Sequence, residues 1–77
     1  MKDEKTFIEL FAGGGGFRIG LERCGWKCVW ANEIDKYACQ TYKKNFGEKE
    51  LVENDIRKIK NEKIPNHTLL CAGALLL

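Results

Sequence analysis

The stretch Phe7-Ile8-Glu9-Leu10-Phe11-Ala12-Gly13-Gly14-Gly15-Gly16-Phe17 is the part of the chain that decides its fold. An apolar run ends in four consecutive glycines and resumes as an amphipathic segment, which predicts a strand, a tight loop and a helix. Glycine suits this bend because, without a Cβ atom, it adopts positive φ and lets a ligand approach the backbone. The following helix directs its free N–H groups at that ligand. A ligand site is therefore predicted here, and a simple turn is the alternative.

A dinucleotide is the first ligand to test, since G-x-G-x-x-G between a strand and a helix binds nicotinamide or flavin cofactors. The loop does not match this pattern in either register. When the pattern starts at Gly13, Arg18 stands where the third glycine belongs, and when it starts at Gly14, Ile19 stands there. The sequence therefore argues against a dinucleotide.

Four ordered motifs make the chain resemble the DNA (cytosine-5)-methyltransferases. Motif I of that family is a strand, then Phe-Ala-Gly-x-Gly-Gly, then a helix, and residues 11–16 fit it. Three later stretches follow in the order of the family: Asn32-Glu33-Ile34-Asp35, Asp55-Ile56-Arg57 and Leu70-Cys71-Ala72-Gly73. The resemblance covers almost the whole chain and implies a truncated Rossmann-like methyltransferase fold that depends on S-adenosyl-L-methionine.

Strands and helices alternate along the chain, which predicts an open α/β sheet of about four mostly parallel strands with two main helices. The first helix starts after the glycines, has Phe17, Leu21 and Cys24 on its apolar face and Arg18 elsewhere, and ends at Gly25. Trp26 and Trp30 are expected to pack between helix and sheet. The other predicted elements are strands at Lys27–Ala31, Glu50–Glu53 and Thr68–Ala72, a helix at Asp35–Phe46, and a connection or frayed turn at Ile56–Asn66.

Composition limits the chain to one small domain, interpreted as a single incomplete cofactor-binding domain over residues 1–77. The chain is 44% hydrophobic and 31% charged, with a formal net charge of +2. This balance is too mild to indicate a nucleic-acid surface, which normally carries clustered basic residues. Lys58, Lys60 and Lys63 are interpreted as a solvated face, with phosphate contact as the alternative.

Location and metal content are also predicted from the sequence. The chain opens without the apolar region of a signal peptide, and Leu75-Leu76-Leu77 is far shorter than the roughly 20 apolar residues that span a bilayer. A cytoplasmic protein without membrane contact is therefore expected. The four cysteines form no C-x-x-C pair and the chain has one histidine, which favours buried free thiols over disulfides or zinc.

The carboxyl ends of parallel strands share one edge of an α/β sheet, where ligands bind. The glycine loop, Glu33 and Asp55 are all expected at that edge. Glu33 lies twenty residues after Gly13, the spacing at which an acidic residue reaches ribose hydroxyls. A surface carboxylate or a charge at the start of a helix is the alternative interpretation of Glu33.

The resemblance identifies the ligand as S-adenosyl-L-methionine. It implies that Glu33 holds the ribose, that Asp55 meets the adenine amino group, and that Phe11 lines the pocket. Ile34 and Ile56 would flank the adenine; without the resemblance they and Phe11 would be interpreted as core residues. The cofactor-binding residues implied are Phe11, Ala12, Gly13, Gly15, Gly16, Glu33, Ile34, Asp55 and Ile56.

The chain departs from the family at several positions. Glu9 stands where the family usually has Asp, Gly14 where a bulkier residue is common, and Asn54 where Gly often occurs. After Gly73 the family continues Phe-Pro-Cys, and that cysteine is the nucleophile, whereas this chain continues Ala-Leu-Leu. Cys71 is expected inside a strand and is not that nucleophile.

No catalytic residue is therefore predicted within residues 1–77. The chain is interpreted as the N-terminal, cofactor-binding part of a DNA (cytosine-5)-methyltransferase, inactive alone, with DNA as the partner of the complete enzyme and bound weakly or not at all by this chain. Two alternatives stay open. The chain is a cofactor-binding half complemented by a separate C-terminal methyltransferase chain, or a small α/β domain without enzymatic function.

Overall fold

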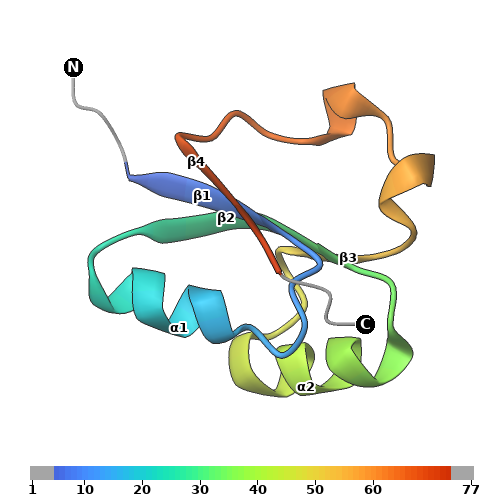
Figure 1. Ribbon diagram of the computed structural model, residues 1–77, viewed down its shortest axis with the longest axis horizontal. Coiled ribbons are helices and arrows are strands. Elements are labelled where there is room, and N and C mark those ends of the chain that lie inside the picture. Colours follow the sequence, from blue (N-terminus) through green and yellow to red (C-terminus); the bar gives the residue numbers. More distant parts are fainter. Residues whose placement is uncertain (1–4, 74–77) are drawn as a thin grey trace.

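The computed structural model describes residues 5–73, and it contains one parallel sheet with two helices packed on it (Figure 1). The strand order is β3-β2-β1-β4, and each of the three neighbouring pairs is parallel. The predicted α/β fold with four parallel strands and two main helices is confirmed. The elements are β1 (Thr6–Leu10), α1 (Gly16–Arg23), β2 (Lys27–Glu33), α2 (Lys36–Phe46), β3 (Leu51–Glu53), the 3-10 turns η1 (Ile56–Lys58) and η2 (Asn61–Lys63), and β4 (Leu69–Ala72).

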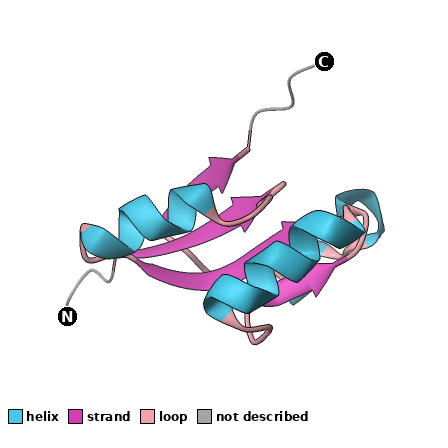
Figure 2. Ribbon diagram, turned by 90° about the horizontal axis from the view of Figure 1, so that it is seen from below, coloured by secondary structure: helices cyan, strands magenta, loops and turns pink. Residues whose placement is uncertain are grey.

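The strand order reverses between β1 and β4. From β1 the chain proceeds outward to β2 and β3, and it then returns across the sheet to β4 on the other side of β1. Both helices cover one face of the sheet, as Figure 2 shows from below, and the connection with η1 and η2 passes on the opposite side in Figure 1. Ligands of open α/β sheets bind beyond the carboxyl ends of the strands at such a reversal. The loop after β1 and Gly73, which follows β4, meet there.

A bulge in β2 decides which of its side chains reach the core. Phe7 pairs with Cys28 and Ile8 pairs with Trp30, so the register shifts by one residue at this point. Cys28 and Ala31, three positions apart, consequently both join Phe7 in the core. The remaining core residues are Ala12 and Tyr42, with Leu21, Trp26, Phe46, Leu51 and Leu69 packed around them.

The same bulge turns Trp30 away from the helices. Trp26 packs against the core as predicted. Trp30 is buried, but it lines a hollow of about 520 Å³ with Val52 and with Lys58 and Ile59 of the connection. The expectation that Trp30 packs between a helix and the sheet is wrong, because strict alternation does not hold across the extra residue.

Helix α1 packs only one residue of its predicted apolar face, Leu21, against the core. Phe17 is 52% exposed and Cys24 is exposed, whereas Arg18 is only 9% exposed. The prediction is wrong for Phe17, Cys24 and Arg18. Arg18 is buried because it has the charged and aromatic partners described below. The four cysteines are free, as predicted, although only Cys28 and Cys39 are buried.

The ends of α2 follow the sequence closely. The Asp35 side chain accepts a hydrogen bond from the Ala38 N–H at 2.8 Å and caps the helix. Gly47 ends it with φ +78°, a conformation that favours glycine. In the described range 5–73 no helix has the length and apolar character needed to cross a membrane, and no cluster of potential metal ligands occurs.

Candidate ligand site at the glycine loop

The loop between β1 and α1 has an unusual backbone. Gly13 and Gly15 adopt φ +59° and +93°, and Phe11 adopts φ +55° although it has a side chain. A non-glycine residue in this region costs roughly 1–3 kcal/mol, and such residues cluster at ligand sites. Phe11 is 39% exposed, and its backbone strain makes the loop a candidate ligand site.

Gly73, the residue directly after β4, lies against Phe11. The Gly73 N–H donates to the Leu10 carbonyl at 2.9 Å, and a Cβ atom at Gly73 would collide with the Phe11 carbonyl oxygen. Only glycine therefore permits this approach. The contact brings the carboxyl ends of β1 and β4 together at the strand-order reversal.

Glu33, the last residue of β2, joins its strand to the glycine loop. Its Oε1 accepts the Gly13 N–H at 2.7 Å, and its Oε2 accepts the N–H groups of Ile34 and Asp35 at 3.0 and 2.9 Å. Glu33 as a whole residue is only 8% exposed to solvent. Because a carboxylate has about four acceptor positions, Oε1 retains one for a hydroxyl donor.

An open hollow of about 490 Å³ lies in front of the loop. Its size falls within the range of about 300–1,000 Å³ that small-molecule sites occupy. No side chain caps α1, so the amino end of that helix is open to a ligand. The hollow is lined by Phe11, Ala12, Gly13, Gly16, Phe17 and Gly73.

Asp55 follows β3 at the same edge of the sheet, and its carboxylate already accepts hydrogen bonds from Arg57. Both carboxylate oxygens accept from the Arg57 guanidinium, at 2.6 Å for the shortest bond, and Oδ1 also accepts the Arg57 N–H at 2.9 Å. These hydrogen bonds lower the pKa of Asp55 to about 2. Asp55 is thus a carboxylate at every physiological pH, held beside the half-buried Ile56.

Backbone and amide bonds keep the ends of β2 and β3 together. The Asn54 N–H donates to the Glu33 carbonyl at 3.0 Å, and Asn32 donates to the carbonyls of Val52 and Asn54 at 3.2 and 2.8 Å. The structure therefore brings the glycine loop, Glu33 and the start of the Asp55 turn to one edge. Ile34 lies there too and is 59% exposed.

A buried polar network, which the sequence did not predict, lies behind the loop. The hydroxyl of the fully buried Tyr42 accepts from Arg18 at 3.0 Å and donates to Glu9 Oε2 at 3.0 Å. Burial raises the pKa of Glu9, whose Oε1 has no partner among the described residues. Arg18 also pairs with Glu22 at 2.9 Å and Glu50 at 3.2 Å. The only sequence signal was the Arg18–Glu22 spacing of four.

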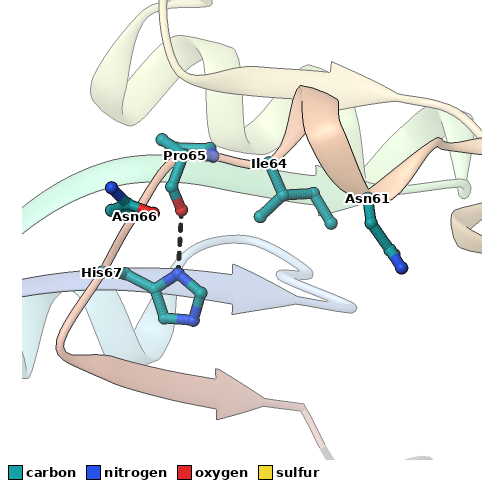
Figure 3. Close-up of a pocket in the computed structure, with 5 residues that line it drawn as sticks. All are labelled: Asn61, Ile64, Pro65, Asn66 and His67. Atoms are coloured by element: carbon teal, nitrogen blue, oxygen red, sulfur yellow. Dashed lines mark hydrogen bonds between the residues drawn. The ribbon is translucent and has the colours of Figure 1, made fainter.

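A second hollow, of about 450 Å³, lies in the connection before β4 (Figure 3). Its residues come from one short stretch, and His67 Nδ1 lies 2.9 Å from the Pro65 carbonyl oxygen. The stretch leads into the amino end of β4, opposite the end that carries the glycine loop. None of the predicted site residues lines it; the lining residues are Asn61, Ile64, Pro65, Asn66 and His67.

Comparisons with known proteins agree on one family. A family model described as C-5 cytosine-specific DNA methylase matches residues 5–74. The chain is 57% identical over 67 residues to the type II methyltransferase M.HhaI of Haemophilus parahaemolyticus, covering 87% of this chain and 20% of that protein. It is 50% identical over 72 residues to M.DsaV of Dactylococcopsis salina, covering 94% of this chain and 20% of the relative.

A solved structure of a Spodoptera frugiperda DNMT2 mutant has the same fold. It matches with a TM-score of 0.70 and 27% identity, over 78% of this chain and 19% of that one. The chain thus spans about a fifth of the length of the proteins that it matches.

Proposed function

The chain belongs to the C-5 cytosine-specific DNA methylase family, and we propose that its residues 5–73 form the part of such an enzyme that binds S-adenosyl-L-methionine. The observation that carries the proposal is the Glu33 carboxylate, which is nearly buried, bonded to the glycine loop, and still able to accept from a hydroxyl. A ribose diol would donate to this carboxylate, and charge-assisted hydrogen bonds are stronger than neutral ones.

The glycine loop would receive the methionine end of the cofactor. A Cβ atom at Gly13 or Gly16 would meet no atom within 4 Å, so the space before them is open. The uncapped amino end of α1 favours a carboxylate, because its N–H groups carry a partial positive charge. Phe11 and Ala12 would contribute apolar contacts from the same loop.

The adenine would lie between the ends of β2 and β3. Ile34 is 59% exposed, and a flat apolar ring would remove that side chain from water. Ile56 would form the opposite wall. The Asp55 carboxylate, with its pKa near 2, would accept a hydrogen bond from the adenine amino group and share its charge with Arg57.

When bound, S-adenosyl-L-methionine supplies the activated methyl group that the complete enzyme would transfer to cytosine C5 in DNA. The residues of this chain would bind and orient it. We propose that they contain no nucleophile: burial raises the pKa values of Cys28, Cys39 and Cys71, and Cys24 lies at the end of α1 remote from the loop. The 77 residues alone would therefore be inactive, with little affinity for DNA. A cytoplasmic location is part of this proposal, because the relatives of the chain include bacterial type II methyltransferases.

A separate C-terminal methyltransferase half is a second candidate partner. Within the described part of the chain, β4 pairs with β1 alone, and Leu70 on this edge strand is 50% exposed. An edge strand offers unpaired N–H and C=O groups to a further strand. A half supplied in trans would dock there and complete the pocket.

The proposal is tested by titrating S-adenosyl-L-methionine into the isotopically labelled chain and following backbone amide signals. We expect saturable shifts at Gly13, Gly16 and Ile34, and none at His67, which lies at the other end of β4. The reduced nicotinamide dinucleotide is the control ligand, because the loop lacks its glycine pattern. Unchanged spectra at millimolar S-adenosyl-L-methionine would contradict cofactor binding by this chain.

A further inference from the structure

We infer that Arg18 and Phe46 are positioning residues for the glycine loop: Arg18 holds the Phe46 ring against Gly15, and the ligand-binding shape of the loop depends on this clamp. The inference rests on the proposed function for the identity of the ligand. The clamp itself is a property of the unliganded chain.

The Phe46 ring lies directly against the loop backbone. A Cβ atom at Gly15 would collide with the ring edge at Cε2 and would lie 3.0 Å from Cδ2. Gly15 is also buried. The ring therefore occupies the space behind Gly15 that a side chain would otherwise fill.

Arg18 fixes the position of that ring. Its guanidinium carbon lies 4.5 Å from the centroid of the Phe46 ring, a distance typical of a cation–π contact. The guanidinium cannot easily move, because it is held by Glu22, Glu50 and the Tyr42 hydroxyl. With Arg18 only 9% exposed, water competes little for this contact.

Helix α2 supports the loop at one further residue. A Cβ atom at Gly14 would lie 3.3 Å from Thr41 Cγ2, and the Asn45 amide reaches the Gly14 carbonyl at 3.5 Å. Gly14 and Gly15 therefore face the last turns of α2. Gly13 and Gly16, by contrast, line the hollow, and a Cβ atom added to either would have no other atom within 4 Å.

The four glycines thus divide into a supported pair and an open pair. Glycine has more backbone freedom than any other residue, so four in succession would populate many conformations without support. Ligand affinity falls in proportion to the fraction of molecules with the competent conformation. The clamp raises that fraction by restricting Gly15 and, through the chain, the neighbouring Gly13 that donates to Glu33.

The first test compares Phe46→Leu and Arg18→Lys in the full chain with Leu69→Ala as the matched control. Leucine keeps apolar volume but loses the flat ring, and lysine keeps the charge but loses the planar guanidinium. Leu69 packs on the core at the amino end of β4, away from the loop. Each variant is measured by urea unfolding, amide hydrogen exchange and calorimetric titration with S-adenosyl-L-methionine.

We expect the exchange of the Gly13 and Gly15 amides to accelerate about tenfold in both clamp variants, and cofactor affinity to fall by a similar factor. Leu69→Ala should lower global stability without selectively changing these amides. If the clamp variants affect the loop no more than Leu69→Ala at equal stability, Arg18 and Phe46 are only packing residues. If the wild type binds no cofactor but loop exchange responds as expected, the proposed function fails and the clamp stands.

The second test is a double-mutant cycle between Gly15→Ala and Phe46→Leu, read by the same amide exchange. Gly15→Ala introduces both a strained φ and a collision with the ring, and Phe46→Leu removes only the collision partner. We expect the alanine to disturb the loop less in the leucine background than in the wild type. Additive effects would overturn the inference, because they would mean that the two residues do not act through their contact.

Discussion

Replacing Glu33 by glutamine removes one charge and changes the side-chain volume very little. Three backbone N–H groups, from Gly13, Ile34 and Asp35, donate to this carboxylate. A hydrogen bond to a charged group is worth about 1.5–3 kcal/mol and a neutral one about 0.5–1.5 kcal/mol. The glutamine amide nitrogen cannot accept at all, so at least one N–H loses its partner. We expect the free energy of unfolding to fall by about 1–3 kcal/mol.

The same change should weaken S-adenosyl-L-methionine binding by about ten- to hundredfold, because the ribose loses a charge-assisted acceptor worth roughly 1.5–3 kcal/mol. Calorimetric titration measures the affinity and urea denaturation the stability. Glu53→Gln is the control, since the Glu53 side chain is 39% exposed and its carboxylate pairs with Lys43 at 3.3 Å. A surface pair of this kind contributes roughly 0–1 kcal/mol. Equal cofactor affinity for wild type and Glu33→Gln would exclude Glu33 from the site.

Three further predictions concern the buried network, the edge strand and activity. Because burial raises the pKa of Glu9 above 4.5, the folded state binds its proton more tightly than the unfolded state; stability should therefore fall as pH rises above about 4.5, and urea titrations of Glu9→Gln should show this slope reduced. Leu70→Lys should lessen concentration-dependent association in sedimentation velocity, since a charged side chain protects an exposed edge; a wild-type chain that is strictly monomeric would contradict this. Finally, the 77-residue chain should transfer no tritiated methyl to unmethylated DNA; incorporation above background would refute its catalytic incompleteness.

The elements that the sequence predicted well are those set by local chemistry. Asp35 caps α2 and Gly47 ends it, because both signals act within one turn of the helix. The spacing of twenty between Gly13 and Glu33 was also informative, since a short strand-helix-strand unit returns the chain to the same edge. The resulting 2.7 Å hydrogen bond joins two of the predicted residues, although their role toward a cofactor stays a prediction.

The features that the sequence did not predict depend on partners from other elements. Arg18 is buried because it pairs with Glu50, just before β3, and donates to the Tyr42 hydroxyl on α2. The residue pattern within α1 predicts neither contact. Trp30 faces away from the helices because the register between β1 and β2 shifts. The partner of Asp55, by contrast, is local, because Arg57 is only two residues away. The motif match predicted a ligand for Asp55 and did not predict this pair.

The glycine run illustrates the limit of a motif match. In sequence the four residues are equivalent, but their surroundings in the structure differ. Gly15 is required by the chain itself, because its φ is +93° and the Phe46 ring occupies the Cβ position. A Cβ atom at Gly14 would lie 3.3 Å from Thr41 Cγ2 and would need only a small shift of that methyl group. Gly16 has no positive φ, and an added Cβ atom would meet no atom within 4 Å. Because Gly16 lines the hollow, we propose that a bound ligand approaches the backbone there.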